Sequence, residues 1–123
     1  MKQILEIDEY GTKEWKLNGL FHREDGPGNE CHEGTKYWCI NGKLHREDGP
    51  AIEYNYGSKE WFINGKRHRV DGPAIEWVND AAYWFVNDEN ITTAIIKDIE
   101  DGILRPYDQW TESDRIKFKL KYS

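Results

Sequence analysis

The sequence predicts a mainly β protein: a single elongated antiparallel meander sheet built of 23-residue hairpin repeats. Three observations lead to this prediction: a fixed period, turn signals at fixed places within it, and alternation of side chains between the turns. The period is clearest in the tryptophans, which recur every 23 residues at Trp15, Trp38, Trp61 and Trp84. Self-similarity of this length is typical of architectures in which each unit covers the apolar face of its neighbour.

Each unit contains two turn signals, in the order Trp-x-x-Asn-Gly-x-x-His-Arg-x-Asp-Gly-Pro. The complete copies run from Gly11 to Glu30, from Gly34 to Glu53 and from Gly57 to Glu76. Asn-Gly after a strand-like run predicts a tight hairpin turn, because both residues tolerate positive φ. Asp-Gly-Pro predicts a second turn, in which Pro fixes its own φ. One unit is therefore strand, turn, short strand or loop, turn and strand, with no room for a helix.

The two-residue period of a strand assigns side chains to faces. Trp61 and Ile63 fall on one face, and their equivalents in the other units share it, so we expect the tryptophans to form a buried ladder. Tyr37, Phe62 and Phe85 fall on the opposite face and are candidates for an exposed aromatic contact surface. If each unit adds two strands, equivalent residues recur roughly every 10 Å.

The chain is expected to form one domain with three parts. Residues 1–10 form an N-terminal capping strand, residues 11–87 the repeat region, and residues 88–123 a cap made of a helix and a strand. Within the repeat region the units are 11–33, 34–56, 57–79 and a partial unit 80–87, where Asp88 replaces the turn glycine.

The non-repeating end changes period. Ile91, Ile95, Ile99 and Ile103 are four residues apart and predict an amphipathic helix from about Thr92 to Asp101. Thr111 and Asp114 resemble a capping box. The last segment alternates basic and apolar residues, which predicts a closing edge strand with basic side chains at Arg115, Lys117, Lys119 and Lys121.

Composition limits the class of partner. The chain has 123 residues and a net charge of −6, with 37% hydrophobic and 14% aromatic residues. An acidic chain is poorly suited to neutralising phosphates, so direct nucleic-acid binding is not expected, whereas a basic protein surface is a suitable partner. The N-terminus lacks a signal-peptide pattern and no run reaches transmembrane length, which predicts a cytoplasmic protein without membrane contact.

The segment Tyr37-Trp38-Cys39-Ile40-Asn41-Gly42-Lys43, together with the period and the closing glycine, resembles MORN repeats. That resemblance implies β-hairpin units stacked into an elongated sheet, which serve binding and scaffolding. The chain departs from the family where it carries His-Arg-x-Asp-Gly-Pro-Ala, a version similar to repeats of bacteriophage and large DNA virus proteins. By this resemblance the protein is expected to be a small viral accessory factor in the host cytoplasm that binds, and inhibits, a host defence protein.

The repeated polar residues are the candidate contact sites. They form three equivalent sets, His22, Arg23 and Asp25; His45, Arg46 and Asp48; and His68, Arg69 and Asp71. In one interpretation they are structural: Asp turns the chain, Arg pairs with Asp, and His caps strand ends. In the other, rows of arginine beside tryptophan hold an anionic nucleotide or signalling molecule.

The repetition favours binding over catalysis, because a catalytic centre needs one asymmetric set of groups. We therefore expect a non-catalytic interaction protein without cofactor, and sequestration of a small anionic nucleotide is the alternative. Cys31, His32, Cys39 and His45 lack the close Cys-x-x-Cys spacing of a zinc site, so no metal is expected. The open sheet edges make a homo-oligomer a further possibility.

Overall fold

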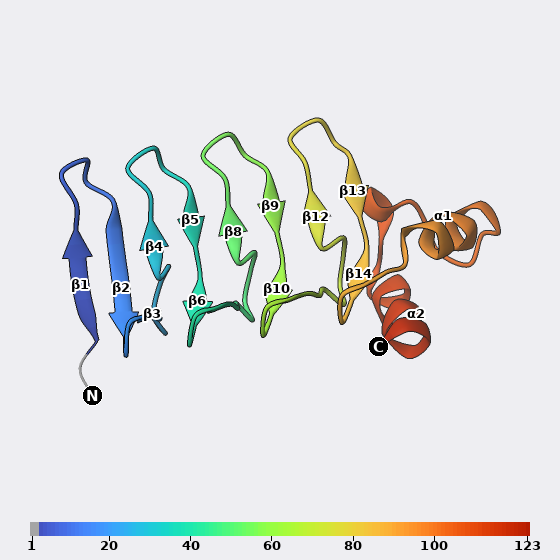
Figure 1. Cartoon of the computed structure of the whole chain (residues 1–123). Helices are drawn as coiled ribbons and strands as arrows, with labels where there is room; N and C mark the ends of the chain where they lie inside the picture. The colour runs from blue at the N-terminus through green and yellow to red at the C-terminus, as the bar shows by residue number, and fades with distance from the viewer. Residues whose placement is uncertain (1–2) are drawn as a thin grey trace.

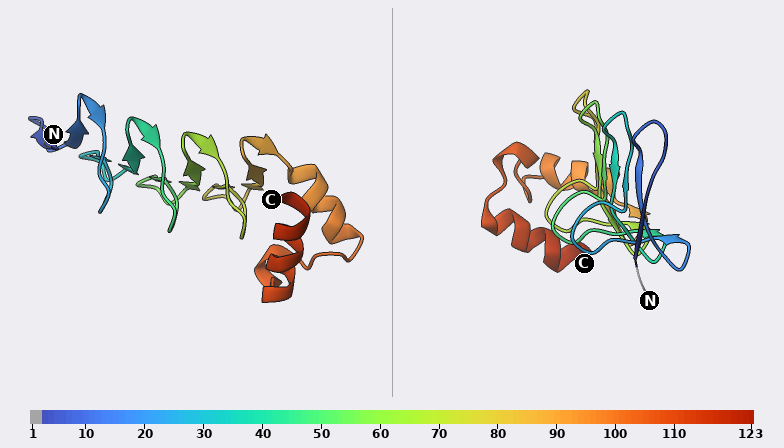
Figure 2. Two further views of the ribbon diagram at one scale, coloured as in Figure 1. Left: turned by 90° about the horizontal axis from the view of Figure 1, so that it is seen from below. Right: turned by 90° about the vertical axis from the view of Figure 1, so that its left-hand side faces the viewer.

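The computed structural model describes residues 3–123 and confirms the predicted open antiparallel meander (Figure 1). Strand order in the main sheet follows the chain, so each repeat lies beside the one before it. The strands along this sheet are β1 (Ile4–Ile7), β2 (Lys13–Leu17), β4 (Asn29–Glu30), β5 (Lys36–Tyr37), β8 (Ile52–Glu53), β9 (Lys59–Glu60), β12 (Ile75–Glu76) and β13 (Ala82–Tyr83). Seen along the sheet axis, the units lie nearly behind one another, with the helical cap to one side (Figure 2).

Each repeat leaves the main sheet at its tryptophan and forms a second, smaller hairpin. The backbone N–H of Trp38 donates to Ala51 O on the main-sheet side (2.7 Å), whereas its carbonyl accepts from His45 N of the small hairpin (3.0 Å). The predicted continuous strand through Trp61 and Ile63 is therefore wrong, because the chain bends between two pairing partners. The small hairpins pair β2 with β3 (Leu20–Phe21), β6 (Cys39–Ile40) with β7 (Lys43–Leu44), β10 (Phe62–Ile63) with β11 (Lys66–Arg67), and β14 (Phe85–Val86) with β15 (Glu89–Asn90).

The Asn-Gly turns have the positive φ values that the sequence predicted. In the second unit φ is 50° at Asn41 and 80° at Gly42, and the N–H of Gly42 donates to Phe21 O of the preceding unit (2.8 Å). Asp88 adopts φ 70° in place of glycine, and its carboxylate accepts a hydrogen bond from Arg67 N (3.2 Å). The fourth hairpin is thus complete and extends beyond residue 87, where the sequence placed the end of the repeats.

A row of hydroxyl side chains ties the outer loops of successive units together. Thr12 Oγ1 accepts from His32 N (3.1 Å), Thr35 Oγ1 from Asn55 N (3.2 Å), and Ser58 Oγ from Val78 N (2.9 Å). Thr35 and Ser58 are buried, so these bonds satisfy backbone groups that a stack of short strands would otherwise leave unpaired. Ala81 stands at the equivalent place in the last unit, where no further loop follows.

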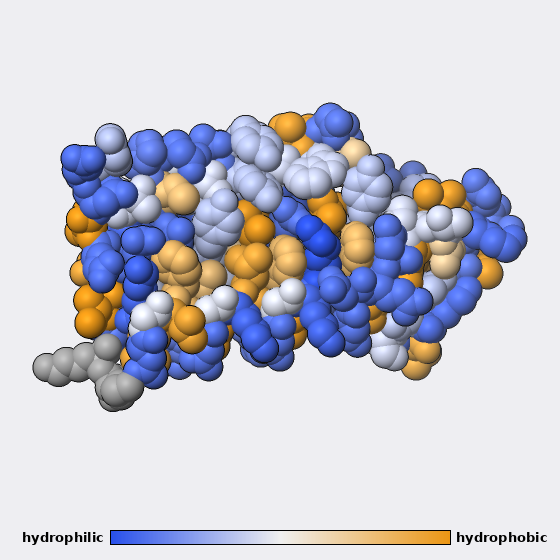
Figure 3. Space-filling view, in the orientation of Figure 1, coloured by the Kyte–Doolittle hydropathy of each residue, from blue (hydrophilic) through white to orange (hydrophobic). Residues whose placement is uncertain are grey.

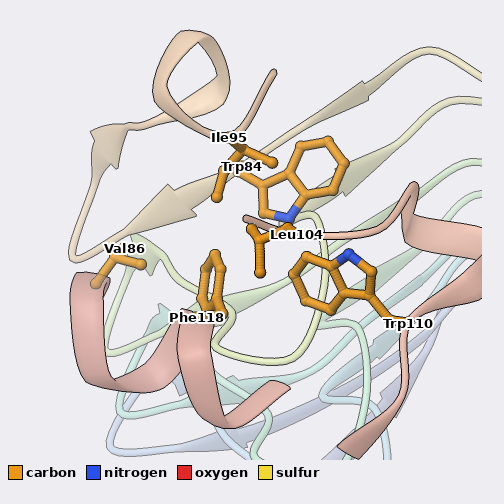
Figure 4. Packing of buried hydrophobic residues seen from close by; sticks show 6 residues of the cluster. All are labelled: Trp84, Val86, Ile95, Leu104, Trp110 and Phe118. Carbon is orange, nitrogen blue, oxygen red and sulfur yellow. The ribbon is translucent and has the colours of Figure 1, made fainter. Parts of the chain in front are cut away.

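The last unit is covered by a helical cap made of α1 (Thr92–Glu100), the 3-10 turn η1 (Tyr107–Gln109) and α2 (Glu112–Tyr122). A buried apolar cluster joins the cap to the sheet (Figure 4), and its members are Trp84, Val86, Ile95, Leu104, Trp110 and Phe118. The predicted helix at residues 92–101 is confirmed to within one residue. The repeats contain a separate, smaller buried cluster, formed by Ala51, Ile52 and Phe62.

The predicted closing strand with its row of Arg115, Lys117, Lys119 and Lys121 is wrong, because this segment is helix α2. The capping box at Thr111 and Asp114 is present at the start of this helix: Asp114 accepts from Thr111 N (2.9 Å) while Thr111 closes the reciprocal bond. Backbone bonding from Thr111 and the guanidinium of Arg105 hold the pKa of Asp114 well below its usual range. In the helix Phe118 points into the core and Leu120 into solvent.

Lys121 and Tyr122 instead anchor α2 to α1. Both donate to the buried carboxylate of Asp98, from Lys121 Nζ at 2.8 Å and from the Tyr122 hydroxyl at 2.6 Å. Burial alone would raise the pKa of Asp98, but these hydrogen bonds outweigh burial and lower it. In the described residues no helix is long and apolar enough to cross a membrane.

Within the segment 1–10, which the sequence predicted as an N-terminal capping strand, Ile4–Ile7 form β1 and pair with β2; residues 1–2 lie outside the described residues. Apolar side chains face solvent at this edge of the sheet (Figure 3). Ile4 is 58% exposed, Leu5 46% and Ile7 58%. The two ends of the sheet are therefore different, one open and one covered by helices. The homo-oligomer that the open sheet edges suggested stays a prediction.

Candidate functional site

The arginine of each complete unit lies flat over the tryptophan of the same unit. The guanidinium carbon lies 3.9 Å from the indole ring centre in all three pairs, Arg23 on Trp15, Arg46 on Trp38 and Arg69 on Trp61. Stacking of this kind combines cation–π attraction with burial of the arginine stem. Trp15, Trp38 and Trp61 are only half-buried, whereas Trp84 is buried, so the expected buried ladder of tryptophans is wrong for the three complete units.

Hydrogen bonds fix the same guanidinium along its edge. In the second unit Arg46 Nε donates to Asp48 (3.0 Å), and Nη1 donates to Pro50 O (3.1 Å) and Glu53 (3.4 Å). The glycine of Asp-Gly-Pro makes room for this arrangement, because a Cβ added to Gly49 would lie 2.9 Å from Arg46 Cζ. Asp, Gly and Pro of the motif therefore serve one purpose, which is to hold the arginine against the indole.

The histidines join one unit to the next. Nδ1 of His22, His45 and His68 accepts a hydrogen bond at 3.0 Å from the backbone N–H of Asn41, Asn64 and Asn87, respectively, 19 residues further along the chain. This bond requires an unprotonated Nδ1, which places the proton of the neutral ring on Nε2. Nε2 of His45 lies 3.6 Å from Glu47, and the arrangement repeats at His22 and Glu24 (3.7 Å).

Acid is expected to weaken this junction at His68. Burial lowers the pKa of His68 below its usual value of 6.5, so the unfolded chain binds the proton more readily than the native protein does. Stability should therefore fall as the pH is lowered below about 6.5. Urea titrations between pH 7.5 and 5.5 should show a smaller fall for His68→Asn, which keeps an acceptor near Nδ1 but does not titrate. An equal pH slope in both proteins would show that His68 is not responsible.

Two grooves lie between successive His-Arg-x-Asp-Gly-Pro loops. The first, about 850 Å³ in volume, separates the loop of Arg23 from Trp38, Ile40 and the loop of Arg46. The second, about 670 Å³, separates the loop of Arg46 from Trp61, Ile63 and the loop of Arg69. Both therefore have an apolar floor, formed by a tryptophan and an isoleucine, between polar walls.

Acidic side chains form the rims of these grooves. Glu24, Asp25, Glu47 and Asp48 have side-chain exposures of 83%, 88%, 84% and 88%. The two aspartates pair with arginine, but each arginine also faces a second acid, Glu30 or Glu53. The rims consequently carry a net negative charge that faces solvent.

At the third equivalent position the cap fills the groove. Tyr107 packs edge-on against Trp84, with ring centres 5.8 Å apart, and Trp110 packs against Tyr107 at 5.2 Å. The sequence is adapted to this contact: Val70 replaces the glutamate found at Glu24 and Glu47, and Ile91 replaces the histidine. These two departures from the repeat are therefore explained by burial beneath the cap.

The structure brings each predicted His, Arg and Asp together in one loop and places the tryptophan beneath the arginine. It does not bring the predicted aromatic surface together. Phe62 is 8% exposed and packs with Ala51 and Ile52, so its prediction as an exposed contact residue is wrong, because the bend at Trp61 turns Phe62 inward. Tyr37 and Phe85 are half-buried.

The sequence did not identify those residues of the grooves and of the filled third position that are not part of the repeated motif. Glu24 and Glu47 occupy the variable position of His-Arg-x-Asp-Gly-Pro, and Tyr107 lies outside the repeats altogether. One feature of the sequence could have identified them: Val70 stands where the first two units have glutamate, and it lies next to the unit in which the pattern ends. Such a local loss of charge indicates a neighbour that covers the position.

Within residues 3–123 no group of three or more His, Cys, Asp and Glu side chains is placed to hold a metal ion. Cys39 is buried, which raises the pKa of its thiol to about 11, and both cysteines are free. Comparisons with family models, curated proteins and solved structures find no match to this chain. The contacts of the site itself are therefore the basis for a functional proposal.

Proposed function

We propose that the protein is a non-catalytic repeat module that binds another protein through the two open grooves. The observation that carries this proposal is the difference between equivalent positions along the sheet. At the third position the groove is filled from within the chain by Tyr107 and its neighbours, whereas the grooves at Trp38 and Trp61 have the same apolar floor and remain open. A half-buried tryptophan in a concave, polar-rimmed site is a typical anchor point of a protein interface.

Charge supports a basic partner. The exposed acids at the rims add to an overall net charge of −6, so a cationic surface would be attracted and oriented before contact. This attraction falls with ionic strength, because exposed charges are screened over about 8 Å at physiological salt. Binding that weakens as salt is added is therefore part of the proposal.

Anion binding, the alternative, finds less support in the contacts. Nε and Nη1 of Arg46 are already bonded to Asp48, Pro50 and Glu53, and the equivalent atoms of Arg69 are bonded in the same way. An anionic nucleotide would have to displace these carboxylates and approach the acidic rims. Each histidine likewise has Nδ1 bonded to a backbone N–H, which favours a structural role over general base catalysis.

The narrower proposal, that the partner is a host defence protein inhibited by a viral factor in the host cytoplasm, rests on the resemblance of the His-Arg-x-Asp-Gly-Pro-Ala units alone. The acidic, repeated surface is compatible with such a role but would serve any basic partner. The general proposal of protein binding can be tested without knowing the host.

Reversing the charge of the rims is expected to abolish binding. A display library of random 12-residue peptides is panned against the protein, and selected peptides are measured against Glu24→Lys/Glu47→Lys. We expect enrichment of basic and aromatic residues, and a loss of affinity of at least tenfold in the variant. Glu9→Lys/Glu100→Lys, with the same charge change at exposed positions away from the grooves, is the control. Peptides that lose equal affinity in both variants, or a library that yields no binder, would contradict the proposal.

A further inference from the structure

We propose that the open grooves accept tyrosine side chains from an extended, basic segment of the partner, with each hydroxyl bonded to the arginine of the preceding loop. This inference rests on the proposed function and names the chemistry of the partner. Its evidence is Tyr107, which occupies the third equivalent position in this chain.

Tyr107 makes three contacts that define a binding position for a phenol. Its hydroxyl accepts a hydrogen bond from Arg69 Nη2 (3.2 Å), and its ring meets Trp84 edge-on, with ring planes at 87°. The hydroxyl also lies close above Gly72, where a Cβ would come within 2.4 Å of it. The loop therefore supplies a donor, the sheet an aromatic wall, and the glycine the space between them.

Each contacting residue has an equivalent in the open grooves, because the repeat places them 23 residues apart. Arg46, Gly49 and Trp61 correspond to Arg69, Gly72 and Trp84 in the second groove, and Arg23, Gly26 and Trp38 correspond in the first. Their guanidinium groups are held in the same orientation, 3.9 Å above an indole.

The arginines differ in the contacts of Nη2. Arg69 uses Nη2 to bind Tyr107, whereas within residues 3–123 Nη2 of Arg23 and of Arg46 has no hydrogen-bond partner. Both side chains are only about one-fifth exposed, so this donor is held in place rather than free to turn into solvent. A hydroxyl oxygen satisfies such a donor without the charge that the acidic rims would repel.

The spacing of the grooves indicates how a partner segment would run. In this chain Pro106 has φ −51° and ψ 143°, but Tyr107 begins the 3-10 turn η1, so the cap supplies the position of the tyrosine and not the backbone of the partner. A polyproline II segment presents every third residue on one side, about 9 Å apart, which matches the spacing of roughly 10 Å between repeats. A partner segment of the pattern Tyr-x-x-Tyr would therefore place one tyrosine in each groove, with basic residues between them facing the rims.

The test uses two synthetic peptides, Lys-Pro-Tyr-Lys-Pro-Tyr-Lys and the same peptide with phenylalanine at both tyrosine positions. Calorimetric titration of the full chain should show the tyrosine peptide binding at least about tenfold more tightly, since each hydroxyl bonds a charged donor. Arg23→Lys/Arg46→Lys lacks both Nη2 donors, so in this variant the ratio of the two peptide affinities should fall to near one, whatever the affinity for the phenylalanine peptide becomes. Thermal unfolding reports whether the variant remains folded.

Equal affinities for the two peptides, or no binding of either, would overturn the tyrosine inference. Groove-dependent library peptides without tyrosine would also overturn it while leaving the proposed function intact, so the two failures are distinguishable. Native mass spectrometry gives a further outcome: a dimer abolished by Tyr107→Phe would show that a second copy's cap fills the grooves, and this too would overturn the inference.

Discussion

Replacing Phe118 by alanine is expected to lower the free energy of unfolding of the cap by about 3–5 kcal/mol, the usual range for removing a buried aromatic ring. Phe118 is fully buried and packs between Trp110 and Tyr122, with ring centres 5.6 and 5.3 Å away. It joins α2 to the cluster around Trp84, so its loss should release both helices before the repeats unfold. Hydrogen exchange of the α1 and α2 amides measures this local stability directly.

Leu120→Ala is the matched control, because Leu120 lies in the same helix and is 82% exposed. The free energy of opening that hydrogen exchange reports for α1 and α2 should change by no more than about 0.5 kcal/mol in Leu120→Ala, the usual range for a surface substitution. If Phe118→Ala and Leu120→Ala had similar effects, helix propensity rather than packing would hold the cap in place. Packing would then not be what holds the cap in the third groove.

Arg46→Ala is expected to destabilise the repeat region by roughly 2 kcal/mol, from loss of the cation–π stack and of hydrogen bonds to charged groups. The substitution exposes one face of Trp38 and leaves Glu53 without its arginine. Urea denaturation followed by tryptophan fluorescence measures the change. Arg115→Ala is the control, because Arg115 pairs with Glu112 on the helix surface at a distance of 4.0 Å. Its loss should change the free energy of unfolding by less than about 0.5 kcal/mol.

A neutral result for Arg46→Ala would mean that the arginine is not a structural clamp. The guanidinium would then be free to serve a ligand with all its donors, and the alternative of anion binding would regain support. The stability measurement therefore tests the structural role of the arginine, on which the argument against anion binding depends.

The repeats were predictable because their signals are local. Asn41-Gly42 requires positive φ, and the same pair at each period sets one hairpin per unit. The bend at Trp61 was not predictable from alternation, since it arises from a change of hydrogen-bond partner between the main sheet and the small hairpin. As a result the pattern placed Phe62 on the wrong side.

The final segment shows two local signals in competition. The alternation of Lys117, Lys119 and Lys121 with apolar residues favours a strand, while the capping box at Thr111 favours a helix. The helix prevails because Asp98 on α1 receives Lys121 and Tyr122 from one turn of α2, a contact that the sequence does not reveal. The grooves depend on similar long-range placement, since Tyr107 lies 38 residues from Arg69.

The most direct test of the grooves as a binding surface is an NMR titration that follows the indole N–H signals while a library-selected peptide is added. The account predicts that the signals of Trp38 and Trp61 shift in a saturable manner, whereas those of Trp84 and Trp110, which the cap covers, stay in place. Saturable binding that leaves Trp38 and Trp61 unchanged would contradict it.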